Sequence, residues 1–137
     1  MMAVIAMTTA AQAAGAPVPG WNDVTYTIGT ESTNIITVKC ELLGYSSALA
    51  LPIVFDAYLS EASDGEGLTG TALSADWADG GDGSLFFQIS SGKYARWQTN
   101  DSGSCQIAMN HSGVRTLYLV ILLPNGLLSV SDAITWA

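Results

Sequence analysis

The chain has 137 residues, of which 49% are hydrophobic and only 12% are charged. Its 12 acidic and four basic residues give a formal net charge of −8, which repels phosphate backbones and anionic lipids and argues against nucleic-acid and membrane partners. The length fits a single domain, and so small a share of charged residues leaves apolar surface that we expect to meet another protein.

The first 20 residues contain no charged side chain. We predict that they form an extended N-terminal arm that lies on a neighbouring subunit, ahead of a domain at residues 21–137. The arm residues expected to make contacts are Val4, Ile5, Pro17 and Pro19. The two prolines also stiffen the junction with the domain, because proline fixes its backbone φ angle.

A signal peptide is the competing interpretation of this segment. Ala11-Gln12-Ala13 resembles a signal-peptidase site after a short hydrophobic stretch, but no basic residue precedes that stretch. The segment is also too short and too rich in small residues to span a bilayer. The arm is therefore the preferred interpretation.

From Trp21 onward the hydrophobic pattern has a period of two, which is typical of strands with one buried face. Residues 24–28 predict a short first strand, and residues 34–42 alternate apolar with polar side chains throughout. After a loop that contains Pro52, residues 53–60 predict a third strand.

Residues 61–83 interrupt this pattern with six of the 12 acidic residues and six glycines. We predict a long exposed loop, mobile or functional. Its carboxylates are the kind of oxygen ligand that calcium takes, which makes calcium binding an alternative. However, the spacing does not follow an EF-hand, and Asp-Gly pairs are ordinary turn formers, so a solvated loop is preferred.

The second half of the chain predicts five further strands, at residues 84–90, 93–99, 104–110, 116–123 and 127–136. The last two form a hydrophobic hairpin around Pro124-Asn125-Gly126, because Asn-Gly accepts the positive φ angles of a tight turn. About eight strands with turns every eight to twelve residues predict an all-β sandwich.

No group of residues has the spacing of a catalytic or metal site. His111, the only histidine, lies in a turn-like Asn-His-Ser-Gly stretch without a recognisable nucleophile, so we expect it in an exposed turn. Cys40 and Cys105 are either one bridge between the sheets or, preferably, two small core residues. We predict no enzymatic activity, no cofactor, no metal and no small-molecule substrate.

Three of the four tryptophans are candidates for contacts between subunits. Trp97 alternates with polar neighbours in a strand and is expected in the core. Trp21, Trp77 and Trp136 lie at the arm junction, in the acidic loop and at the end of the last strand, where burial within one small domain is harder to arrange. Because tryptophan is frequent at interface centres, we expect these three at an interface, with a sugar-stacking platform as the alternative.

The order of residues in three segments carries a further signal: Ala57-Tyr-Leu-Ser-Glu-Ala-Ser-Asp-Gly65, Thr99-Asn-Asp-Ser-Gly103, and the closing hairpin from Leu117 to Ala137. Together they resemble the small immunoglobulin-like virion proteins of tailed bacteriophages. In that group an AYLS-acidic-DG strand and loop, a T-D-x-x-G turn and a final YL-V-x-P-x-G hairpin recur. The resemblance covers roughly residues 34–137, is most specific in the hairpin, and does not extend to the arm.

This resemblance implies an immunoglobulin-like β-sandwich of about 7–8 strands with a structural role on the virion and no catalytic residues. The small size and the apolar arm favour a capsid decoration, or cement, protein on the outer capsid surface. Such a protein binds across adjacent subunits of the major capsid protein, typically as a homotrimer. The alternatives are an immunoglobulin-like module of the tail or baseplate and a glycan-binding module. An antibody-type domain is not implied, because no Tyr precedes Cys105 by two residues.

Overall fold

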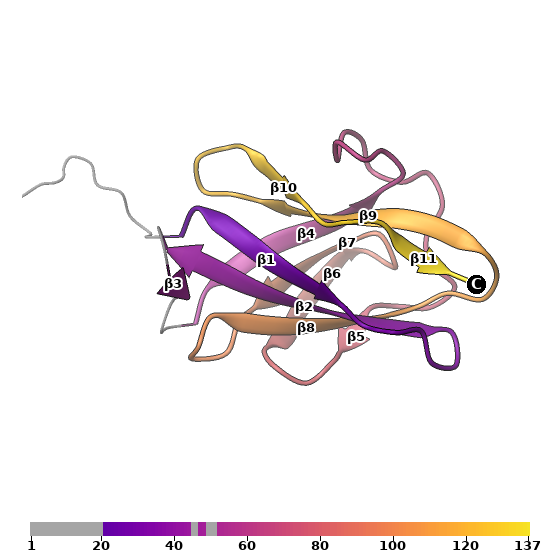
Figure 1. Ribbon diagram of the computed structural model, residues 1–137, viewed down its shortest axis with the longest axis horizontal. Coiled ribbons are helices and arrows are strands. Elements are labelled where there is room, and N and C mark those ends of the chain that lie inside the picture. The colour runs from indigo at the N-terminus through magenta and orange to yellow at the C-terminus, as the bar shows by residue number, and fades with distance from the viewer. Residues whose placement is uncertain (1–20, 45–46, 49–51) are drawn as a thin grey trace, which may run out of the picture.

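The computed structural model describes residues 21–44, 47–48 and 52–137. This part of the chain contains eleven strands and no helix (Figure 1). The strands are β1 (Asp23–Ile28), β2 (Ile35–Gly44), β3 (Ser47–Ala48), β4 (Val54–Ser60), β5 (Ala78–Asp79), β6 (Ser84–Ser90), β7 (Tyr94–Gln98), β8 (Ser104–Asn110), β9 (Arg115–Leu122), β10 (Leu128–Val130) and β11 (Ile134–Trp136).

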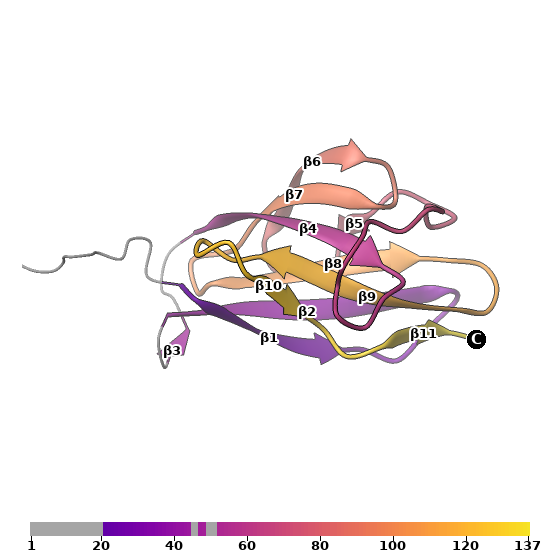
Figure 2. The same cartoon turned by 90° about the horizontal axis from the view of Figure 1, so that it is seen from above.

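The strands form two antiparallel sheets that pack face to face (Figure 2). The five-stranded sheet has the order β1-β2-β8-β5 with β3 beside β2, and the six-stranded sheet has the order β10-β9-β4-β7-β6 with β11 beside β9. The predicted all-β sandwich is confirmed. The predicted arm at residues 1–20 lies outside the described residues.

The core follows from the period of two that the sequence shows. In β2 the side chains of Ile36, Val38, Cys40 and Leu42 are buried, and those between them are partly exposed. Facing them across the sandwich, β4 buries Phe55, Ala57 and Leu59 in the same alternation. Burial of each large aliphatic side chain contributes about 1.5–3 kcal/mol, so this alternation is what holds the two sheets together.

The predicted last strand is two short strands that both pair with β9. β10 pairs Leu128 with Leu122, whereas β11 pairs Ile134 with Leu117, a register that differs by one residue. Ser131 marks the break, since its Oγ accepts a hydrogen bond from the Leu119 amide at 2.9 Å. This slip turns Ile134 and Trp136 toward the core, because a shift by one residue exchanges the two faces of a strand.

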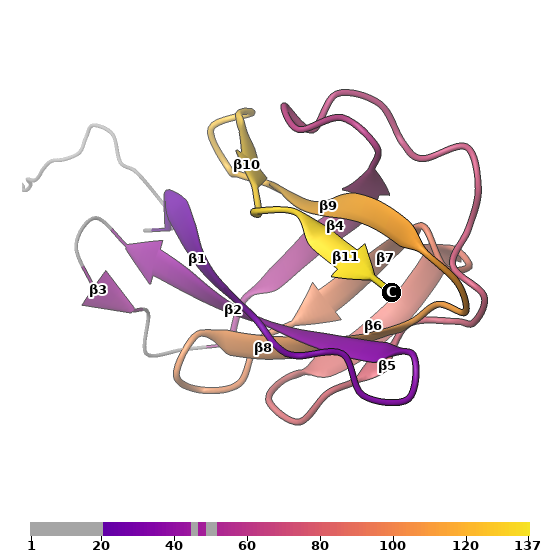
Figure 3. The ribbon, with the colours of Figure 1, turned by 45° about the vertical axis from the view of Figure 1, so that its right-hand side comes forward.

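The acidic segment 61–83 is largely exposed and irregular, as predicted, but a few buried side chains anchor it to the sandwich. The segment passes from β4 of one sheet to β5 of the other (Figure 3). Thr69, Leu73 and Trp77 are buried along it, and Gly65, with φ of 79°, lies against the side chains of Val120 and Val130. Leu73 and Trp77 therefore belong to the core, whereas Leu68 of the same segment is exposed.

Both cysteines are free and fully buried, as the preferred interpretation predicted. Cys40 in β2 lies directly opposite Cys105 in β8, so both belong to the same sheet. The alternative of a bridge between the two sheets is therefore wrong. Burial raises the pKa of both thiols, that of Cys105 to about 12, so both remain protonated at neutral pH and act as small apolar side chains.

Candidate interaction surface

The tryptophans expected at an interface lie inside the domain. Trp21, Trp77 and Trp136 are 5%, 2% and 0% exposed. Trp77 packs against Trp97, with ring centroids 6.0 Å apart, because the segment before β5 folds inward. Trp136 is buried because β11 pairs with β9. Trp77 and Trp136 thus cannot serve as an exposed contact surface or a sugar platform, and the expectation that the three side chains would be hard to bury is wrong.

The other expected contact residues, Val4, Ile5, Pro17 and Pro19, lie outside the described residues. Trp97 is in the core, as predicted. Candidate contacts among the described residues must therefore come from exposed apolar side chains. Two groups of these stand out, and both lie on the six-stranded sheet.

The first group lies on edge strand β6, and we call it the β6 patch: Phe86, Phe87 and Ile89, which are 58%, 46% and 46% exposed. In the described part of the chain β6 pairs with β7 alone. Its register shifts between Leu85 and Phe87 and again between Gln88 and Ser90, which leaves Phe86 and Ile89 unpaired. Such bulges redirect side chains, and here they turn apolar groups toward solvent.

The second group surrounds an open groove of about 330 Å³ at the start of β4 and the end of β9. Its apolar lining comes from Trp21, Val54, Phe55, Leu122, Leu123 and Pro124. Val54 and Leu122 are exposed and lie on the side of the sheet that faces away from β2. We call this the Trp21 groove.

An ion pair lines the Trp21 groove on its side toward Phe87 of the β6 patch. The Asp56 carboxylate accepts hydrogen bonds from Arg96 Nε at 2.6 Å, from Arg96 Nη2 at 3.1 Å and from Tyr94 Oη at 3.0 Å. The Arg96 guanidinium also lies 5.4 Å from the centre of the Phe87 ring. Asp56 and Arg96 thus satisfy each other within the domain. Their opposite charges cancel, so the pair adds no net charge to this face of the sheet.

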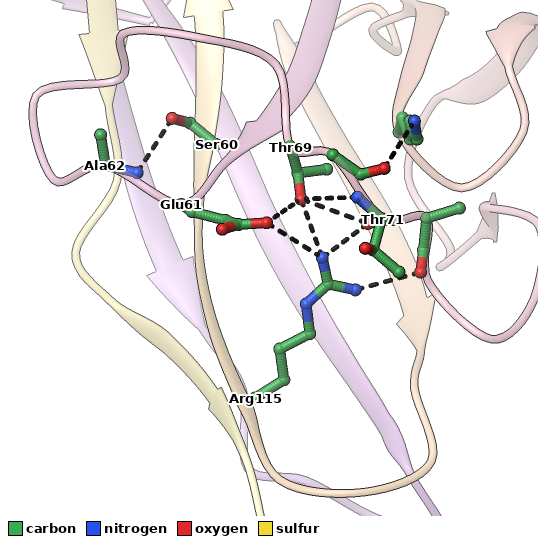
Figure 4. Close-up of polar contacts among 9 residues, drawn as sticks. Ser60, Glu61, Ala62, Thr69, Thr71 and Arg115 are labelled. Carbon is green, nitrogen blue, oxygen red and sulfur yellow. Dashed lines mark hydrogen bonds and ion pairs between the residues drawn. The ribbon is translucent and has the colours of Figure 1, made fainter.

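A hollow of about 490 Å³ lies at the other end of the domain, between Glu61, Thr71, His111, Arg115 and Thr116. Within this hollow, the Arg115 guanidinium donates hydrogen bonds to the segment before β5, as Figure 4 shows. Arg115 Nη1 donates to the Ala72 carbonyl at 3.0 Å, and Nη2 donates to Thr69 Oγ1 at 2.8 Å. Glu61 Oε2 lies 3.7 Å from Nη2 and accepts from Thr69 Oγ1. This network fastens the segment to β9.

His111 is half-buried rather than in a fully exposed turn. Its Nδ1 lies 3.2 Å from Ser74 Oγ, and its ring meets Trp136 edge-on at 5.8 Å. Ser74 Oγ also accepts a hydrogen bond from the Ser112 amide at 3.0 Å, so it serves as a local link between two loops. Burial, together with the nearby Arg115, holds the pKa of His111 below its usual range.

The carboxylates of the acidic segment are used locally. Asp64 accepts from the Glu66 amide, Asp79 accepts from the Leu85 amide, and Asp76 accepts from Ser91 Oγ. Among the described residues, no group of three or more His, Cys, Asp or Glu is arranged to hold a metal. The described residues also include no helix long and apolar enough to cross a membrane.

The Asp56–Arg96 pair predicts a pH dependence of stability. The hydrogen bond from Arg96, reinforced by Tyr94, holds the pKa of Asp56 below its usual range, although burial opposes the shift. Because the folded-state pKa is the lower one, this contribution is complete above the carboxyl's ordinary pKa of about 4 and is lost as the pH falls through the folded value. We expect urea unfolding between about pH 5 and about pH 2 to show a steeper loss of stability for the wild type than for Asp56→Asn. Asp101→Asn, in an exposed turn, is the control and should follow the wild type.

Comparison of the chain with protein-family models, with curated proteins and with solved structures found no match.

Proposed function

We propose that this protein is a non-enzymatic structural protein of a tailed-bacteriophage virion, which decorates and stabilises the outer surface of the capsid by binding the major capsid protein. The sequence resemblance in residues 34–137 supports the virion role. A sandwich fold alone hosts many functions, so the role must be argued from surfaces. The observation that carries the proposal is the β6 patch.

The composition of the patch suits a protein contact. Phe86 and Phe87 lie side by side, with ring centroids 6.0 Å apart, and Ile89 is exposed on the same edge strand, which has no charged residue. Interface centres are depleted of charge and enriched in aromatic residues and arginine, and Arg96 lies against Phe87 here. Because Arg96 already pairs with Asp56, a partner can cover it without leaving a buried charge unpaired.

The stabilising mechanism is mass action. A ligand that binds only the assembled shell stabilises it by RT ln(1 + [L]/Kd) at each site. Many sites on one particle add their contributions. A small domain with one apolar patch is sufficient for this function, since no chemistry is required of it.

The test is binding of purified protein to capsids that lack it, measured by co-sedimentation and by cryo-electron microscopy. We expect Phe86→Asp and Ile89→Asp each to weaken binding by about 10- to 100-fold, equivalent to about 1.4–2.8 kcal/mol. Thr25→Asp adds the same charge at an exposed position of β1 and should bind as the wild type does. Equal binding by all variants would exclude the β6 patch, and density in the tail alone would replace the decoration role by the tail-module alternative.

A further inference from the structure

We propose that the Trp21 groove is the docking site for the N-terminal arm, residues 1–20, of a second copy of this chain. This inference goes beyond the proposed function, because it concerns how free copies associate and holds whatever surface the assembly binds. The arm and the groove would together link each copy to its neighbour. The argument uses charge, shape, and the position at which the arm joins the domain.

Charge selects the arm as the part of a second copy that can approach. All 16 charged residues lie within residues 21–137, so the domain carries the whole net charge of −8, whereas residues 1–20 carry no charged side chain. Two domains therefore repel each other, but an arm and a domain do not. The groove matches the arm, since its only charged neighbours, Asp56 and Arg96, neutralise each other.

The groove also matches the arm in kind. Val54, Leu122, Leu123 and Pro124 offer aliphatic surface in an open depression of about 330 Å³. Within the arm, Val4-Ile5 is the pair of adjacent β-branched residues with the most apolar area to bury. We therefore assign Val4 and Ile5 to the groove.

The attachment point favours a second copy over the same chain. Trp21 directly follows the arm and also lines the groove, so docking within one chain would require the 15 residues between Ile5 and Trp21 to loop back to their own origin. Pro17 and Pro19 fix φ just before Trp21, which removes two of the backbone torsions available for that reversal. Extended, 15 residues span up to about 50 Å, which is longer than a strand of this sandwich and sufficient to reach a neighbour.

Arms exchanged in this way make a head-to-tail contact, in which each copy gives one arm and receives another. Such a contact produces a closed ring where the rotation closes and an open chain of copies where it does not. The proposal is the closed form, a discrete oligomer of the free protein, and it assigns the contact to two short, separated pieces of sequence.

The experiment measures the mass of the full-length protein by light scattering over a range of concentrations. We expect the wild type to be a discrete oligomer, and we expect Val4→Asp/Ile5→Asp and Leu122→Asp each to raise the dissociation constant at least about tenfold. Thr8→Asp/Thr9→Asp in the arm and Thr25→Asp on β1 are the matched controls and should keep the wild-type mass. Near-UV circular dichroism checks that every variant is folded.

A charge-swap variant makes the test specific. Ile5→Asp combined with Leu122→Lys places opposite charges at the proposed contact, and we expect it to restore association that either change alone removes. A monomeric wild type would overturn the proposal. Dissociation by Leu122→Asp with no effect of the arm variants would also overturn it, in favour of a contact between domains. Because shell binding is tested separately through the β6 patch, failure of one proposal leaves the other standing.

Discussion

Replacing Trp77 with alanine is expected to lower the free energy of unfolding by about 3–5 kcal/mol, the usual cost of removing a buried tryptophan. The side chain is 2% exposed and stacks on Trp97 in the core. Its removal leaves a cavity that β5 and the segment before it cannot close without losing their pairing with β8. Urea unfolding followed by far-UV circular dichroism measures the effect independently of the lost indole fluorescence.

Phe86→Ala is the matched control, because it removes an aromatic side chain that is 58% exposed. We expect its effect on stability to stay within about 0.5 kcal/mol. Trp77→Phe should fall between the two, since it keeps most of the ring volume and removes an indole Nε1 that has no hydrogen-bond partner among the described residues. A loss below about 1 kcal/mol for Trp77→Ala would contradict the burial of this residue and restore it as a surface contact.

The strands were predictable because each carries its own signal. The alternation in residues 34–42 identifies β2 and its buried face, and residues 84–90 and 104–110 match β6 and β8 at both ends. The alternation of apolar and polar residues is a local property of the sequence. It can therefore be recognised without knowing which strands pair with each other. The two-residue strands β3 and β5 lack such a signal, because they form only through pairing with β2 and β8.

The burial of single side chains along residues 61–83 was not predictable from composition. Glycine and aspartate dominate the segment and indicate turns, whereas its burial depends on where Leu73 and Trp77 meet the two sheets. Apolar residues spaced through a polar segment were the available signal for a segment packed on the core. The same holds for Trp136, whose face is set by the one-residue slip at Ser131 rather than by its distance from the end of the strand.

The β6 patch was missed for a related reason. Phe86-Phe87 breaks the alternation of that strand, and adjacent large apolar residues in a half-buried strand indicate that one of them faces solvent or that a bulge is present. The Trp21 groove has no sequence signal, because its walls come from β4, from the end of β9 with the turn after it, and from Trp21, two residues before β1. These walls are brought together by the order in which the strands pair in the sheet, which is a property of the whole fold.

Replacing Arg115 with alanine is expected to cost about 3 kcal/mol, because hydrogen bonds to a charged group contribute about 1.5–3 kcal/mol each and partial exposure reduces their sum. The Arg115 side chain is only 14% exposed, and it joins Glu61, Thr69, Thr71 and Ala72 (Figure 4). Its loss releases the segment between β4 and β5. Urea unfolding measures the stability, and limited proteolysis should show faster cleavage within residues 61–76.

Lys39→Ala is the control for loss of a basic residue, since Lys39 and Glu41 lie 3.9 Å apart with both side chains 38% exposed. Exposed pairs of this kind contribute little, so we expect a change below about 0.5 kcal/mol. Arg115→Lys keeps the charge but loses the planar fork, and it should give an intermediate loss. Arg115→Ala should also raise the pKa of His111, because Arg115 is one of the two causes that hold it down. An NMR titration that left the His111 pKa unchanged, with stability as high as in Lys39→Ala, would show that Arg115 does not fasten this segment to β9.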